Sequence, residues 1–365
     1  MLSKHAHYFT SSPDWQTLAP STSAPPDEEL PLTPQAQRDG EAKWAAAWAA
    51  QHPTSEYGYG TQVQAIQTRD GASINLKIYE PLHDSVDTNR DKRLPILYVT
   101  HGGGWMQGSA VTEEVFFLRE LLTHLPRFLV VSVEYRLAPE NPFPIPFNDC
   151  WDALLWVVKE SEGLGGDSER LYLAGSSAGG SLAAALAVEA HEHFKISGLI
   201  LNVPVLCHPQ HRPPFCENGS YDECVGGLLS GAEMFEIWAD PFTAKPIGND
   251  QRLTSGKIAD MYVPDKAHGD NWRASPLRAD LKKLPPTYVF VAGQDPVRDE
   301  GIAFAEAAEK VGARIKMHVY QGVPHTFAEF PELETTKRFN VDMLAAFTDL
   351  LDEAQTQQTQ QRSGS

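Results

Sequence analysis

The chain has 365 residues, of which 42% are hydrophobic and 21% are charged. This composition excludes fibrous, collagen-like and wholly disordered proteins, and the length suits one large α/β domain with insertions. With 30 Lys and Arg against 48 Asp and Glu, the formal net charge is −18, which argues against nucleic acid or an anionic membrane as a partner because both bind basic surfaces.

The N-terminal part, residues 1–50, predicts an arm followed by a cap helix. About the first 40 residues are rich in Pro, Ser and Thr, a composition typical of loosely structured chain. Glu41–Ala50 is Ala-rich, with Trp44 and Trp48 four residues apart on one helix face. The first residues contain no apolar run that could serve as a signal peptide, and no apolar stretch is long enough to span a membrane. We therefore expect a cytoplasmic protein.

The middle of the chain alternates between strands and helices. Two alternating runs, Gln62–Thr68 and Ser73–Tyr79, meet across Asp70-Gly71 and predict a β-hairpin. Short apolar runs predict buried strands at Leu94–Thr100, Phe128–Tyr135, Leu171–Ala174, Gly198–Val203, Thr287–Ala292 and Ile315–Tyr320. Helical patterns lie at Phe147–Lys159, Ala178–His193, Glu300–Val311 and Thr336–Glu353. Apolar strands that alternate with helices predict an α/β fold, with a mostly parallel sheet covered on both faces.

One long stretch, between Val203 and Thr287, interrupts this alternation. It is too long for a structureless loop in a compact domain. We therefore predict an inserted cap subdomain over 205–275, with Ala232–Trp238 as one of its helices, while a long surface excursion stays open. The remaining boundaries are a core in two parts, 51–204 and 276–354, and a flexible tail over 355–365.

Three of the four cysteines, Cys207, Cys216 and Cys224, lie close together, with His208 and His211 between the first two. Such a cluster is compatible with a metal site, but no Cys-x-x-Cys pair is present to anchor one. Four cysteines are also too few for a disulfide scaffold in a chain of this length. We expect a loop with incidental thiols and no metal.

The strongest chemical signal is a Gly-x-Ser-x-Gly pattern between a predicted strand and an Ala-rich helix. Gly175 and Gly179 flank Ser177. A serine on a sharp strand-to-helix turn has a strained backbone, and only small neighbours avoid a clash there. The pattern predicts Ser177 as a nucleophile at the sheet edge; taken alone, it would also fit a phosphate loop or a plain tight turn.

A second glycine-rich loop follows the first predicted buried strand. His101 precedes three consecutive glycines, and Trp105 follows them. Backbone N–H groups of glycines can approach a substrate oxygen closely because no side chain intervenes. Together with the N–H of Ala178 they would form an oxyanion hole; alone, the loop would be a generic turn.

A serine nucleophile needs a base that is held by an acid. Asp295 follows one buried strand, and His325 lies in the loop after the next strand along the chain. Such strand ends meet at the edge of the sheet where Ser177 is expected. We therefore predict His325 as the base and Asp295 as the acid. Asp299 and Glu300 compete with Asp295, but their positions indicate the first turn of the next helix.

Four blocks in this order resemble the hormone-sensitive-lipase branch of the α/β-hydrolases, a family of carboxylester hydrolases. They are His101–Trp105, Tyr135–Glu140, Gly175–Gly180 and Asp295–Gly301, the last joined by His325. The resemblance implies an α/β-hydrolase fold with an eight-stranded, mainly parallel sheet. It also implies a helical cap built from the N-terminal segment and the insertion.

The resemblance also implies a role for each site residue. Ser177 would be the nucleophile, Asp295 the acid and His325 the base. The N–H groups of Gly103, Gly104 and Ala178 would be the oxyanion donors. One departure is visible at Ser176, where the family has an Asp that supports the loops around the site.

The combined prediction is a serine carboxylester hydrolase that cleaves small to medium apolar esters through an acyl-enzyme, with no cofactor. Its expected partner is a small-molecule ester, and a homodimer stays open. The predicted substrate-binding residues are Trp105, Phe215, Met234, Phe235 and Trp238. Acyl transfer, amide cleavage and a non-hydrolytic elimination or cyclisation remain alternatives because they can use the same residues. A ligand-binding receptor is less favoured because the base is present.

Overall fold

The computed structural model of the chain describes residues 3–18, 34–82, 93–125, 128–216, 219–220 and 255–363. Its strands form one eight-stranded sheet in the order β1-β2-β4-β3-β5-β6-β7-β8. The strands are β1 (Tyr59–Gln67), β2 (Ser73–Pro81), β3 (Leu94–Thr100), β4 (Leu129–Glu134), β5 (Gly166–Ser176), β6 (Gly198–Asn202), β7 (Thr287–Ala292) and β8 (Ile315–Tyr320). β2 pairs antiparallel with β1 and with β4, and the other neighbours pair in parallel. The predicted mostly parallel sheet and its hairpin are confirmed.

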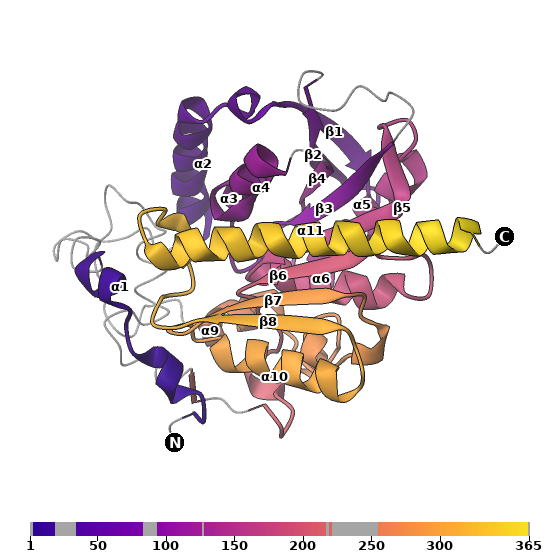
Figure 1. Cartoon of the computed structure of the whole chain (residues 1–365). Helices are drawn as coiled ribbons and strands as arrows, with labels where there is room; N and C mark the ends of the chain where they lie inside the picture. The colour runs from indigo at the N-terminus through magenta and orange to yellow at the C-terminus, as the bar shows by residue number, and fades with distance from the viewer. Residues whose placement is uncertain are drawn as a thin grey trace.

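Helices cover both faces of this sheet (Figure 1). One face carries α5 (Ile145–Glu160), α6 (Ala178–Ala190) and α10 (Arg298–Lys310), and the other carries α4 (Arg119–His124) and the long α11 (Glu334–Ser363). Successive strand side chains point to opposite faces, so Ile96 and Tyr98 belong to the first core and Leu97 and Val99 to the second. Every residue of β7 is buried, which explains why the central strands are continuous apolar runs.

Smaller elements complete the described chain. The further α-helices are α1 (Pro13–Leu18), α2 (Pro34–Gln51), α3 (Ala110–Glu113) and α9 (Ser255–Tyr262), and a π-helical turn spans Glu114–Leu118. Short 3₁₀ turns lie at Ala6–Phe9, Thr54–Tyr57, Pro209–His211, Lys266–His268, Pro276–Arg278, Leu281–Lys283 and Phe327–Glu329. The segment from Ala110 to His124 was not predicted as helical.

The N-terminal arm differs from the prediction of loosely structured chain. Trp15 is only 2% exposed. The N–H of Ser12 donates to the carbonyl of Gly322 at 3.0 Å, and the N–H of Gly322 donates to the carbonyl of Tyr8 at 2.9 Å. One buried aromatic side chain and a two-bond backbone pairing therefore anchor residues 3–18, which corrects the composition-based prediction for this part.

The C-terminal helix is longer than predicted. The predicted helix ends at Glu353, whereas α11 continues to Ser363; the flexibility of the tail over 355–365 stays a prediction. The added residues are mostly Gln and Thr, without Gly or Pro, so none of them breaks a helix once α11 is anchored on the sheet.

The predicted cap insertion is described only in part. Residues 205–216, 219–220 and 255–275 are described, and α9 lies among them. The predicted helix Ala232–Trp238 lies outside the described residues. The boundaries between core and cap therefore stay predictions.

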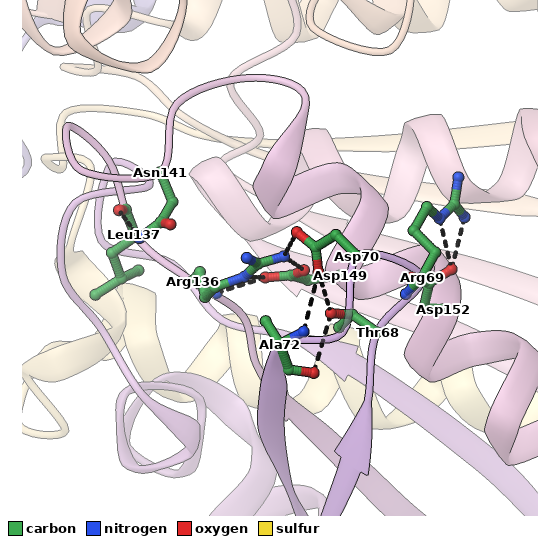
Figure 2. Close-up of polar contacts among 9 residues, drawn as sticks. All are labelled: Thr68, Arg69, Asp70, Ala72, Arg136, Leu137, Asn141, Asp149 and Asp152. Carbon is green, nitrogen blue, oxygen red and sulfur yellow. Dashed lines mark hydrogen bonds and ion pairs between the residues drawn. The ribbon is translucent and has the colours of Figure 1, made fainter.

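An ion-pair network joins the hairpin turn to α5 (Figure 2). The Nε and Nη2 atoms of Arg136 donate to the two carboxylate oxygens of Asp149, at 2.9 and 2.6 Å. Nη2 also donates to Asp70 in the turn at 2.8 Å, and Arg69 pairs with Asp152 of α5 at 2.6 Å. Asp149 is fully buried, and a buried carboxylate needs a partner such as this bidentate guanidinium. The network holds the chain that leaves β4 against the hairpin and α5.

Candidate active site

Ser177 lies on the sharp turn between β5 and α6. Its backbone angles, φ 54° and ψ −119°, are rare for a residue with a side chain, at an order-of-magnitude cost of about 1–3 kcal/mol. A Cβ atom at Gly179 would lie 2.0 Å from the carbonyl oxygen of Thr100. Only glycine therefore lets the start of α6 pack this closely against the end of β3, as the Gly-x-Ser-x-Gly pattern requires.

The structure brings Ser177, His325 and Asp295 together. The imidazole Nε2 of His325 lies 2.8 Å from Ser177 Oγ, and Nδ1 lies 2.6 Å from Asp295 Oδ2. Asp295 is 1% exposed, and its Oδ1 accepts from the N–H of Val297 at 2.9 Å. The side chain of His325 stays 16% exposed. A hydroxyl, an imidazole and a carboxylate in line can pass the serine proton to the imidazole, which the buried carboxylate orients.

The two competing carboxylates face other partners. Asp299 accepts from Nε of its neighbour Arg298 at 2.9 Å. Glu300 accepts from the N–H of Leu206 at 2.6 Å, and burial raises its pKa to about 7. Both lie in α10, as their position in the sequence indicates, so Asp295 is the carboxylate that meets the imidazole.

The glycine loop lies directly against Ser177. A Cβ atom at Gly102 would lie 3.6 Å from Ser177 Cβ. Gly103 and Gly104 adopt φ values of 110° and 61°, and a Cβ atom at Gly103 would lie 2.2 Å from the carbonyl oxygen of Gln107. The N–H of Ala178, at the first position of α6, has no intrahelical partner. Backbone amides therefore border the hydroxyl from two elements, and their use as oxyanion donors stays a prediction.

His101 holds the glycine loop in place. Its ring stacks on Tyr135 with 4.1 Å between centroids and 8° between planes, and Nδ1 lies 2.8 Å from the carbonyl of Gly102. The Tyr135 hydroxyl donates to the His101 carbonyl at 2.8 Å. Burial lowers the pKa of His101 to about 4, so a neutral imidazole supports the loop.

Sequence reasoning missed Glu113, a fully buried carboxylate behind the site. Its Oε1 accepts from the N–H of Gly102 at 2.7 Å, and its Oε2 accepts from the Ser176 hydroxyl at 2.7 Å. Burial raises the pKa of Glu113 to about 7. One signal could have found it: Glu113 and Glu114 directly precede the apolar run Val-Phe-Phe-Leu, so a helix there must bury at least part of an acidic pair.

A model of the family described as the alpha/beta hydrolase fold matches residues 97–329. The chain belongs to the α/β-hydrolase family. It is similar to Esterase LipI of Mycobacterium tuberculosis, 31% identical over 237 residues that cover 65% of this chain and 66% of the relative. It is also similar to 2-hydroxyisoflavanone dehydratase of Glycyrrhiza echinata, 27% identical over 340 residues that cover 87% and 94% of the two chains.

Among solved structures, the chain is similar to a hyperthermophilic esterase from the archaeon Pyrobaculum calidifontis. The TM-score is 0.70 at 28% identity, and the match covers 94% of this chain and 99% of that one. Family and relatives together make this α/β-hydrolase a hydrolytic enzyme of the carboxylesterase type.

The predicted substrate-binding residues of this α/β-hydrolase fall into two groups. Trp105 is 4% exposed and stacks on Tyr262 of α9, with 4.2 Å between centroids and 3° between planes. Phe215 is 52% exposed. The predicted cap residues Met234, Phe235 and Trp238 lie outside the described residues. The stack joins the glycine loop to the cap-side helix, and a role in substrate binding stays a prediction for all five.

Nothing in the described part of the chain offers a metal site. Over those residues, no group of three or more His, Cys, Asp or Glu side chains is arranged to hold a metal ion. Cys207 and Cys216 are buried, burial raises the pKa of each to about 12, and Cys224 lies outside the described residues. Among the described helices, none is both long and apolar enough to cross a membrane.

Proposed function

We propose that the protein hydrolyses carboxylic esters with Ser177 as nucleophile, His325 as general base and acid, and Asp295 as the orienting carboxylate. The observation that carries this proposal is the continuous hydrogen-bonded line from Ser177 Oγ through the imidazole to Asp295, at 2.8 and 2.6 Å. It lies beside the glycine loop, at one edge of the sheet. The esterase relatives support the same reaction.

The reaction follows from this geometry. His325 Nε2 takes the hydroxyl proton as Ser177 Oγ attacks the ester carbonyl. The N–H groups of Gly103, Gly104 and Ala178 stabilise the oxyanion, and the positive end of α6 adds to that stabilisation. His325 then returns the proton to the leaving alcohol, which leaves an acyl-enzyme. Water, deprotonated by His325, releases the acid and restores the serine.

We further propose small to medium apolar esters as the substrate class. An aromatic cluster adjoins the glycine loop, because Trp105 stacks on Tyr262 and Phe143 packs edge-on against the same ring at 5.8 Å. Apolar walls with a few convergent polar groups are typical of small-molecule sites. A homodimer and a cytoplasmic location stay predictions of the sequence.

A non-hydrolytic reaction is the second candidate. One relative that covers 87% of this chain is named a dehydratase, so the fold also supports chemistry in which no ester is cleaved. The two candidates differ in product, since hydrolysis releases one acid and one alcohol per ester consumed. Mass analysis of the products from an ester panel separates them.

The test of the proposed function is Ser177→Ala. We expect p-nitrophenyl butyrate hydrolysis by the purified protein to fall by more than about a hundredfold, because loss of a triad member usually costs far more. Ser168→Ala is the matched control, since Ser168 lies near the opposite end of the same strand, β5. Retention of more than about one hundredth of the rate in Ser177→Ala would reject this serine as nucleophile.

A further inference from the structure

Glu113 links the two loops that meet at the candidate active site. Its Oε1 binds the N–H of Gly102, one residue before the first predicted oxyanion donor. Its Oε2 binds the hydroxyl of Ser176, one residue before the predicted nucleophile. Both contacts are 2.7 Å, and Glu113 is 0% exposed. A single carboxylate therefore connects the end of β3 with the end of β5, directly behind the reacting groups.

We propose that Glu113 is a positioning residue for ester hydrolysis. It fixes Gly102 against Ser176, so that the amides of the glycine loop stay aligned with the oxygen that forms when Ser177 attacks. This inference rests on the proposed function and extends it to a residue outside the four sequence blocks that carry the resemblance.

The residue types at this junction explain why a carboxylate is needed. The N–H of Gly102 and the hydroxyl of Ser176 are both donors, and an ionised carboxylate can accept from both at once. Ser176 also accepts from Asn202 Nδ2 at 3.1 Å, so its own proton must go to another acceptor. The family resembled by this chain has Asp at position 176; here that position holds a donor, and the acceptor enters from α3.

The helix that carries Glu113 is itself held by two other carboxylates. Glu134 accepts from the N–H of Ala110, the first residue of α3, at 2.9 Å. Glu41 of α2 accepts from the N–H of Gly108 at 2.7 Å and from the Thr112 hydroxyl at 3.2 Å. Glu113 thus reaches the site from a helix whose first turn is fixed on two sides, which is what positioning within a fraction of an ångström requires.

Close packing makes the site sensitive to this contact. A Cβ atom at Gly102 would lie 3.1 Å from the carbonyl oxygen of Ser176 and 3.6 Å from Ser177 Cβ. Oxyanion donors act on charge that develops in the transition state, so a shift of the loop lowers kcat rather than substrate affinity.

The first experiment compares Glu113→Gln with Glu114→Gln. The neighbouring Glu114 is equally buried, but its carboxylate accepts from Lys77 Nζ and the Tyr79 hydroxyl on β2, at 2.6 Å each. It is therefore a matched control that loses a buried carboxylate away from the loops. Turnover of p-nitrophenyl butyrate is measured per active serine, counted with a fluorophosphonate, and thermal unfolding is measured alongside.

We expect Glu113→Gln to lower kcat per active serine by about tenfold or more, with KM within about threefold. The amide has one acceptor oxygen and one donor NH2 group, so it cannot accept from both Gly102 and Ser176. Glu114→Gln should keep kcat per active serine within about twofold, whatever its effect on thermal stability. A purely structural role predicts instead that Glu113→Gln changes stability and the count of active serines, with kcat per active serine unchanged; that result would overturn the proposal.

The second experiment moves the carboxylate from position 113 to position 176. Ser176→Asp alone places two buried carboxylates face to face and should lower kcat. In the double variant Glu113→Gln with Ser176→Asp, the new carboxylate accepts from the new amide and from Asn202 Nδ2. The kcat of the double variant should therefore be at least about threefold higher than that of Glu113→Gln alone. No gain over Glu113→Gln alone would contradict the proposal.

Two further results distinguish failure of the Glu113 proposal from misfolding of the variant and from failure of the proposed function. If Glu113→Gln gives no folded protein, Ser176→Ala carries the test, since it removes the hydroxyl that Glu113 and Asn202 contact but leaves the Glu113 carboxylate on Gly102. A kcat equal to wild type would then overturn the proposal. If the wild-type protein hydrolyses no ester, or Ser177→Ala keeps more than about one hundredth of the wild-type rate, the proposed function itself has failed. That failure is distinguishable because it is seen without any change at Glu113.

Discussion

Ser177 is held in a conformation that its own residue type disfavours. The chain on both sides maintains it: the N–H of Ser177 donates to the carbonyl of Asn202 at 2.8 Å, and its carbonyl accepts from the N–H of Val205 at 3.1 Å. Both partners lie at or just after the end of β6, the neighbour of β5. The strain is therefore supported by the sheet edge, and the hydroxyl is held toward the imidazole before any substrate binds.

At the same scale, Asp295 and Asp299 can be distinguished by one experiment. Asp295→Asn should lower kcat by about 10⁴-fold, because an amide there favours the wrong imidazole tautomer. Asp299→Asn weakens the buried contact to Arg298 and should lower the melting temperature while kcat per active serine stays within about threefold. Steady-state kinetics with active-site counting measures both. The reverse order of effects on kcat would show that the acid has been misassigned.

The sequence predicts reactive residues best where they lie in the turn or loop directly after a strand. Ser177, Asp295 and His325 could each be found because a recognisable strand precedes a turn that carries the reactive group. Glu113 follows no such rule, since its helix α3 spans only Ala110–Glu113. Its two partners come from loops distant in the chain, so only the folded structure reveals the contact.

Among the elements, the N-terminal arm has an unexpected relation to the site. Its backbone pairs with Gly322, three residues before His325. The Gln294 side chain, next to Asp295, donates to the carbonyl of Phe9 at 2.8 Å. The arm thus contacts both the loop that carries the proposed acid and the loop that carries the proposed base. It should limit the motion of each.

Two glycine substitutions test this contact. Gly322 has φ 71°, and a Cβ atom there would lie 2.2 Å from the carbonyl oxygen of Thr10 in the arm. Gly312 has φ 84°, with nothing within 4 Å of such an atom. Both Ala variants carry the same backbone strain, about 1 kcal/mol or more. Only Gly322→Ala also displaces the arm.

We therefore expect Gly322→Ala to reduce the melting temperature and kcat more than Gly312→Ala does, and to speed proteolytic cleavage within residues 3–18. Thermal unfolding, kinetics and limited proteolysis of the full-length variants measure this. Equal effects of the two substitutions would mean that the arm does not hold the catalytic loops.

How well each element could be predicted depends on where its stabilising contacts lie. β3 and β7 match their predicted bounds, because buried parallel strands are apolar runs. β8 also matches its bounds, but the prediction that it is buried is wrong, because it is the edge strand and only Tyr320 in it is buried. The helical segment 110–124 was not predicted, because it begins with a very short helix and a π-helical turn and because it buries two glutamates. The anchoring of the N-terminal arm was not predicted, because backbone pairing with Gly322 does not depend on residue composition.

At the scale of the whole molecule, the parallel sheet explains why residues so far apart in sequence can act together. β3, β5, β7 and β8 all end at the same edge, and the glycine loop, Ser177, Asp295 and His325 follow them in that order. The two cores, one on each face, hold these strand ends in register. The sheet therefore places the candidate site, while a contribution of the cap region stays a prediction.

Covalent labelling tests the central claim most directly. The full-length protein is treated with a fluorophosphonate, digested and examined by mass spectrometry, alongside His325→Ala. The account predicts a single adduct, on Ser177, formed in step with the loss of esterase activity and strongly slowed in His325→Ala, because the imidazole must activate the hydroxyl. An adduct on another residue, or full esterase activity after complete labelling of Ser177, would contradict it.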